Sequence, residues 1–359
     1  MNQRRTLIMA LGAGALTAPF ASFAQAPAHP SGKPWRIGFL GAGVRPSAAQ
    51  PDGNVDAFVR AMRDLGYVEG RNLSLEWRFA GGEYAKLPVL AAELVQARPD
   101  LLVTYGTGAA RALHDATKSI PIVIAAAIDP VGSGFAASFA RPGGNVTGLS
   151  AMAVDLGPKH LEMLAEMVPK LARVAVLVNP GNSGHAALVK NVQAAAKILK
   201  IRLSTVSAST ADEIERAFAS VRREGAGGSG GSGGSGVIVA GDAVFAGLGK
   251  QIAAAAARHR LPVIGIYREH VMAGVLMGYG QDIAAFHRRA ATYVDKILKG
   301  RKPADLPIEQ PTIIELFING KTAKTLGLKI PHALLISAEK RAGRRRTRGS
   351  DRSGPTCPR

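Results

Sequence analysis

Residues 100–108 read Asp-Leu-Leu-Val-Thr-Tyr-Gly-Thr-Gly, and this stretch decides the fold. Residues 100–105 predict a short buried strand, and the two glycines predict a tight turn directly after it. The pattern of residues 109–117 then favours a helix. A buried strand that turns straight into a helix is the βα unit of a parallel sheet. The rest of the chain is best understood as repeats of this unit.

The same strand–helix alternation occurs in two successive sets. The predicted strands are 36–40, 73–79, 100–105, 121–128 and 146–149, then 174–178, 202–206, 237–240 and 262–265. The predicted helices are 56–65, 87–96, 109–117, 158–167, 185–199, 211–221 and 248–258. Two such sets predict an α/β fold of two doubly wound parallel-sheet lobes. A late helix (283–298) and a late strand and helix (313–318, 321–326) indicate that the chain crosses back to complete each lobe. Several crossovers form a hinge, with a cleft between the lobes.

These patterns predict a domain organisation. Lobe 1 comprises residues 35–149 and 280–306, and lobe 2 comprises residues 150–279 and 307–337. Residues 25–34 are a Pro/Ala linker, and the Gly/Ser repeat at 225–236 is a flexible insert in lobe 2. The basic, polar segment 338–359 is predicted to be a disordered tail.

The N-terminus has the features of a secretion signal. Arg4-Arg5 precede an apolar run that ends at Ala21, and Ser22-Phe23-Ala24 supply small residues at a cleavage site. Residues 1–24 are therefore a signal peptide, which either the twin-arginine or the general secretion route would read. The mature chain is expected outside the cytoplasm. Its single cysteine, Cys357, cannot form an internal disulfide.

The net charge of +19 raises the question of nucleic-acid binding. The final segment from Ala338 carries eight Lys/Arg against Glu339 and Asp351. The remaining excess is spread along the chain without the clustering that a nucleic-acid surface needs. A solvated basic surface is the interpretation, and no nucleic-acid partner is expected.

The motifs typical of enzymes are incomplete in this chain. Ser229 and Ser232 match a nucleophile elbow only inside the Gly/Ser repeat, and Gly320-Lys321-Thr322 lacks the first glycine of a phosphate loop because Glu315 stands there. The turn at Gly106 has Arg111 where a dinucleotide loop needs a small residue. The eight histidines show no metal-ligand spacing. We therefore expect no catalytic residues, no metal and no cofactor.

Polar residues and glycines recur at the predicted strand ends of both lobes. Ligands bind beyond the carboxyl ends of the strands in open α/β sheets, so these residues are the binding-site candidates. Asp129 or Asp242 would pair with a ligand amine, the amides of Gly106 and Thr107 would hold a carboxylate, and lobe 2 would add hydrogen bonds from its amides. The full candidate set is Gly41, Ala42, Gly106, Thr107, Asp129, Pro130, Asn179, Asn182, Asp242 and Tyr279. Tyr105, Phe135 and Tyr279 are the nearest aromatic candidates.

Several longer stretches carry a resemblance to a known family. They include Leu65-Gly66-Tyr67-Val68-Glu69-Gly70, Arg141-Pro142-Gly143-Gly144-Asn145-Val146-Thr147-Gly148, residues 290–300, Glu309-Gln310-Pro311-Thr312 and Lys321-Thr322-Ala323. With these residues the chain, from about Trp35 to Ile336, resembles the ABC transporter substrate-binding proteins of the type I periplasmic binding fold, which include tryptophan- and tyrosine-binding proteins. The Gly/Ser repeat and the basic tail depart from the family pattern.

The resemblance implies a periplasmic solute receptor. It would bind a small polar metabolite, such as an amino acid, between its lobes and deliver it to an ABC permease in the inner membrane, as a monomer. Two alternatives remain from the sequence: a sensor module for a membrane signalling protein, and an exported enzyme on the same fold. The sequence does not name the solute.

Overall fold

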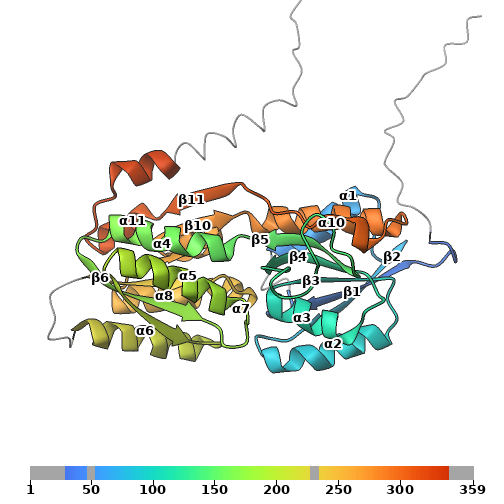
Figure 1. Ribbon diagram of the computed structural model, residues 1–359, viewed down its shortest axis with the longest axis horizontal. Helices are drawn as coiled ribbons and strands as arrows, with labels where there is room; N and C mark the ends of the chain where they lie inside the picture. Colours follow the sequence, from blue (N-terminus) through green and yellow to red (C-terminus); the bar gives the residue numbers. More distant parts are fainter. Residues whose placement is uncertain (1–28, 47–52, 227–233, 339–359) are drawn as a thin grey trace, which may run out of the picture.

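The computed structural model describes residues 29–46, 53–226 and 234–338, and its chain forms two α/β lobes side by side (Figure 1). Each lobe is built around one sheet. The first sheet has the strand order β2-β1-β3-β4-β5, and the second has the order β11-β10-β9-β8-β6-β7. The predicted signal peptide and most of the predicted tail lie outside the described residues.

The first sheet is parallel throughout. Its strands are β1 (Trp35–Gly41), β2 (Leu73–Phe79), β3 (Leu101–Tyr105), β4 (Ile122–Ile128) and β5 (Val146–Ala151). Helices α1 (Gly53–Asp64) and α10 (Ile283–Leu298) pack against each other, and so do α2 (Leu87–Gln96) and α3 (Thr107–Ala116). The two pairs cover opposite faces of the sheet (Figure 1). Strands buried on both faces need continuous apolar runs, and all seven residues of β4 are buried accordingly.

The second sheet is parallel except at one edge. It consists of β6 (Leu171–Val178), β7 (Arg202–Ser207), β8 (Gly234–Val239), β9 (Val263–Gly265), β10 (Met277–Gln281) and the antiparallel β11 (Ile314–Ile318). Its helices are α4 (Ala153–Met167), α5 (His185–Ile198), α6 (Ala211–Ala226), α7 (Ala243–Gly247), α8 (Gly249–His259), α9 (Arg268–Ala273) and α11 (Gly320–Thr325). Alternate residues of β6 divide between two apolar clusters: Val174 and Val176 face one, Ala175 and Leu177 the other. Helices therefore bury both faces of this sheet as well.

Three crossovers join the lobes. The chain passes from β5 to α4, from β10 to α10, and from the short 3₁₀ helix at Pro303–Asp305 to β11. Gln281 ties all three together: its Oε1 accepts from the backbone N–H of Met152 at 2.8 Å, and its Nε2 donates to the carbonyl of Pro311. This side chain is 7% exposed, so its two bonds lie inside the hinge.

Strand β10 was not predicted, because the composition of its five residues does not favour a strand. The strand reads Met-Gly-Tyr-Gly-Gln, and glycines weaken strand patterns. A Cβ on Gly280 would lie 2.2 Å from the carbonyl oxygen of Ile266, so the glycine is what lets the two segments approach.

The predicted Gly/Ser insert is shorter than expected. Helix α6 runs on to Ala226, and Gly234 to Gly236 already pair with β6 as the start of β8. The range 225–236 was therefore wrong at both ends: its first two residues continue helix α6, and at its other end pairing with β6 overrides the low strand propensity of Gly234 and Gly236. Residues 227–233 lie outside the described part of the chain.

Candidate functional site

Asp242 is the centre of a polar cluster at the carboxyl end of β8. It caps the short helix α7, with Oδ1 accepting from the N–H of Val244 at 2.9 Å. Asn179 Nδ2 donates to the same Oδ1 at 3.1 Å, and Asn182 Nδ2 donates to Oδ2 at 2.8 Å. Asp242 is only 2% exposed. A buried carboxylate is stable only with such a set of donors, and the asparagine side chains supply it from the loop after β6.

Tyr84 reaches this cluster from the other lobe. It opens a single 3₁₀ turn between β2 and α2, and its hydroxyl donates to Asp242 Oδ2 at 2.7 Å. Burial, followed by the nearby charge of Asp242, raises the pKa of Tyr84 well above its usual value, so the phenol stays protonated as a donor. The contact closes the cleft between the lobes at this point.

A cavity of about 50 Å³ lies between the lobes beside this contact. Its walls come from the strand ends of both sheets, and among the described residues that line it Asp242 is the one with a charge. The lining residues are Asn54, Tyr105, Gly106, Thr107, Ala126, Ala127, Ile128, Ala151, Ala153, Asn182, Gly241, Asp242, Ala243, Ala246, Ile266, Tyr267 and Ile283. An apolar and aromatic wall with one carboxylate suits a small organic solute that carries a cationic group.

Two tyrosines give the cavity its aromatic character. Tyr105 ends β3 and Tyr267 lies two residues after β9, and both are buried. The Tyr267 hydroxyl donates to the backbone carbonyl of Asp242 at 2.8 Å, which fixes the ring against the wall. Burial raises the pKa of Tyr267 well above its usual value, so this hydroxyl remains a donor.

The structure brings half of the predicted site together. Gly106, Thr107, Asn182 and Asp242 line the cavity, and Asn179 is bonded to Asp242. Thr107 stands at the N-terminus of α3, and its Oγ1 accepts from the N–H of Ile128 at 3.1 Å.

The other predicted residues are not among those lining the cavity. Gly41 is the last residue of β1, Ala42 follows it, and Pro130 lies two residues after the end of β4. Asp129 is exposed, and its Oδ1 accepts from the N–H of Gly132 at 2.8 Å, so its side chain closes a turn. Tyr279 packs in the apolar core of lobe 2, where its carbonyl accepts from His160 Nε2 at 2.6 Å. A part of these five residues in solute binding stays a prediction.

The sequence did not single out Tyr84 or Tyr267. Tyr84 lies outside the strand ends on which the prediction rested, and its role depends on how the lobes meet. Tyr267 lies two residues after a predicted strand, 262–265, so a search of the strand ends for aromatic residues would have found it.

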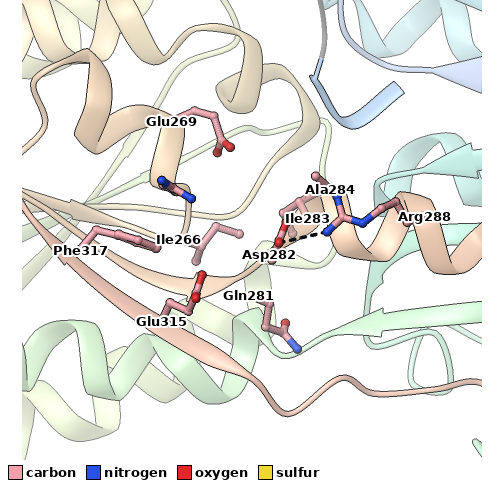
Figure 2. Close-up of a pocket in the computed structure, with 10 residues that line it drawn as sticks. Ile266, Glu269, Gln281, Asp282, Ile283, Ala284, Arg288, Glu315 and Phe317 are labelled. Carbon is pink, nitrogen blue, oxygen red and sulfur yellow. Dashed lines mark hydrogen bonds and ion pairs between the residues drawn. The ribbon is translucent and has the colours of Figure 1, made fainter. Parts of the chain in front are cut away.

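A second, larger cavity lies beside the hinge. Its volume is about 460 Å³, and it shares Ile266 and Ile283 with the cavity between the lobes. Figure 2 shows its walls, which come from α9, β10, β11 and the start of α10. The lining residues are Ile266, Arg268, Glu269, Gln281, Asp282, Ile283, Ala284, Arg288, Glu315 and Phe317, and we call this cavity the hinge pocket.

Metal sites and membrane-spanning helices are both missing from the described ranges. Within residues 29–46, 53–226 and 234–338 no three His, Cys, Asp or Glu side chains gather in a metal-binding group. None of the helices in those ranges combines the length and the apolar character that crossing a membrane requires.

Two α/β lobes with a parallel core, a three-crossover hinge and a lined cavity between strand ends define a solute-binding protein of the type I periplasmic binding fold. The chain belongs to the ABC transporter substrate binding protein family, whose model matches residues 48–342. Members of this family bind solutes and are not enzymes, as the sequence predicts for this chain.

Relatives with solved structures or curated names agree with this assignment. A tyrosine-binding protein of Clostridioides difficile (strain R20291) is 27% identical over 273 residues, which is 76% of each chain. A conserved domain protein from Vibrio cholerae has a TM-score of 0.75 and 28% identity, over 85% of this chain and 99% of that one. The ABC domain from Streptococcus pneumoniae in complex with L-Trp has a TM-score of 0.72 and 23% identity, over 85% and 99% of the two chains, and it shows the shared fold.

Proposed function

We propose that this protein is the periplasmic solute receptor of an ABC uptake transporter and that it binds an amino acid with an aromatic or apolar side chain. The observation that carries the proposal is the Asp242 cluster, a carboxylate held at a lobe junction by donors from both lobes. A carboxylate binds an ammonium group through charge-assisted hydrogen bonds, and amino acids carry such a group.

The remaining walls account for the rest of such a solute. The solute carboxylate meets the N-terminus of α3 at Gly106 and Thr107, where helix N–H groups favour an anion. The side chain lies against Tyr105, Tyr267 and Ile266. Tyrosine and L-Trp, the ligands of two proteins to which this chain is similar, have this chemistry.

Entry of the solute requires the lobes to move apart. A cavity of about 50 Å³ accommodates a few water molecules rather than an amino acid. Opening at the hinge separates Tyr84 from Asp242 and exposes the carboxylate to the solute. Closure around the solute then presents a shape that a permease recognises, and an exported monomer performs this cycle in the periplasm.

Isothermal titration calorimetry with the twenty L-amino acids tests the proposal. We expect at least one aromatic or branched amino acid to bind, and we expect Asp242→Asn to reduce its affinity at least tenfold. Asp129→Asn is the matched control, because Asp129 is a strand-end aspartate outside the cavity lining. Binding that is equally sensitive to both substitutions, or insensitive to both, contradicts the proposed site.

A further inference from the structure

The hinge pocket has the size of a small-molecule site and charged walls of its own. Its volume of about 460 Å³ falls in the range of known ligand pockets. Glu269 and Glu315 direct their carboxylates into it from opposite sides, and Arg288 extends toward it from α10 (Figure 2). The pocket is therefore bordered by Glu269, Glu315 and Arg268 of lobe 2 and by Asp282 and Arg288 at the start of α10, the helix that packs on the first sheet.

Its acidic side is partly withdrawn from water. Glu315 is 8% exposed, although it lies on the edge strand β11. A carboxylate at this depth interacts more strongly with a bound cation than a surface carboxylate does, because solvent screens it less. Ile266 and the ring of Phe317 provide apolar surface beside it.

The two arginines of the hinge pocket make only weak contacts within the protein. Arg288 contacts Asp282 at 3.3 Å, but the side chains are 51% and 27% exposed, and exposed ion pairs contribute little stability. The guanidinium of Arg268 stands 5.1 Å from the centre of the Phe317 ring. Either arginine can exchange its present contact for a ligand carboxylate, which offers two oxygens to the guanidinium fork.

We propose that the hinge pocket is a second binding site, which takes a small zwitterion with one ammonium and one carboxylate. The ammonium pairs with Glu315 and Glu269, and the carboxylate pairs with Arg288 and Arg268. A molecule held this way connects β11 of lobe 2 with α10 of lobe 1.

Binding there is expected to act on the hinge. Gln281 lines the pocket and also holds the other two crossovers through Met152 and Pro311. A ligand that joins the two walls favours the lobe arrangement in which they are close, so it and the cleft solute should raise each other's affinity.

Equilibrium dialysis of the full chain with radiolabelled amino acids, supplied singly at millimolar concentration, tests the second site by stoichiometry. We expect two sites in total, of which Asp242→Asn removes one and Glu315→Gln removes the other. Arg288→Gln should weaken the same site as Glu315→Gln. Glu162→Gln is the matched control, because Glu162 is an exposed acid on α4 that pairs only with Lys159 among described residues.

The outcomes separate the two sites. A single site that Asp242→Asn removes and Glu315→Gln leaves intact overturns the hinge-pocket inference and keeps the cleft function. A single site with the opposite sensitivity supports the inference and contradicts the cleft function. If Asp242→Asn fails to fold, Glu315→Gln alone tests the hinge pocket. The inference requires that this variant bind one amino acid molecule fewer per chain than the wild type. Absence of any bound amino acid overturns both.

Discussion

The Tyr84 hydroxyl of lobe 1 lies 2.7 Å from the Asp242 carboxylate of lobe 2, and this hydrogen bond joins the two sides of the cleft. Hydrogen bonds to charged groups contribute about 1.5–3 kcal/mol. We expect Tyr84→Phe to weaken solute binding by roughly tenfold to a hundredfold, because it removes a bond that forms when the lobes close. Calorimetry measures the change.

Tyr67→Phe is the matched control for this substitution. Tyr67 also donates to an aspartate, Asp295 at 3.0 Å, but both partners belong to lobe 1: Tyr67 follows α1 and is buried in the core of that lobe, and Asp295 is on α10. Its loss should lower stability and leave solute affinity unchanged. Equal effects of the two variants on affinity would show that the Tyr84 bond has no special part in closure.

Gly181 shapes the surface against which Tyr84 closes. A Cβ at this position would lie 2.7 Å from Tyr84 Cγ, closer than side chains tolerate. Gly181→Ala should therefore hold the lobes apart and reduce solute affinity at least tenfold. Small-angle scattering should show a larger radius of gyration in the presence of solute.

A double variant tests whether the contact between residue 181 and Tyr84 causes this loss of affinity. With Tyr84→Ala also present, Gly181→Ala should cost almost nothing further, since the side chain that it meets is gone. Gly247→Ala is the control, because a Cβ added at Gly247 would have no atom within 4 Å of it. Additive losses in the double variant would rule out the clash as the cause.

Two buried histidines make the stability of lobe 2 depend on pH. Burial lowers the pKa of His160 and of His270 to about 4, each against a smaller opposing effect of one backbone hydrogen bond. The unfolded chain binds these protons near pH 6.5 and the folded chain only near pH 4. Stability is therefore complete above about pH 6.5 and falls as the pH drops toward 4, by roughly 3 kcal/mol for each histidine.

Urea unfolding at pH 7 and pH 5 checks this dependence. His270→Gln keeps a donor for the carbonyl of Phe245, which His270 Nε2 contacts at 2.8 Å, but it cannot titrate. This variant should lose less stability between the two pH values than the wild type. His332→Gln, at an exposed position, should behave as the wild type does. An unchanged pH dependence in His270→Gln would exclude His270 as a contributor.

Gln281 should stabilise the hinge because it bonds to both of the other crossover segments. Gln281→Leu keeps the volume but leaves the Met152 N–H and the Pro311 carbonyl without this partner, so we expect a loss of about 1–3 kcal/mol in unfolding free energy. Faster hydrogen exchange at Met152 would locate the effect. Gln251→Leu on the exposed side of α8 is the control, and a loss as large there would mean that Gln281 has no hinge role.

Most of the fold could be predicted from the sequence because buried parallel strands consist of continuous runs of apolar residues. The stretch ending at Tyr105 forms β3 and turns into α3 at Gly106 as expected. Strand β10 could not be predicted, since its glycines reflect close tertiary contacts rather than strand propensity: Gly280 lies against Ile266, and Gly278 against Tyr267 and Val271. The antiparallel direction of β11 likewise follows from its pairing with β10.

The site could be predicted only as far as it depends on single strand ends. Asp242 and Asn182 come together because the strands before them, β8 and β6, are neighbours with parallel directions. Asp129 has the same sequence context, yet its carboxylate turns back to Gly132. Tyr84 approaches across the cleft, and no local pattern encodes a contact between two lobes.

The packing of α10 against α1 has a consequence for the order in which the chain can fold. Phe58 on α1 shares one core with Phe286 and Val294 on α10. A ribosome makes α1 early and α10 only after nearly the whole second sheet has been synthesised. The first lobe therefore keeps an open apolar face through most of translation, and its stability arises only when the polypeptide is almost complete.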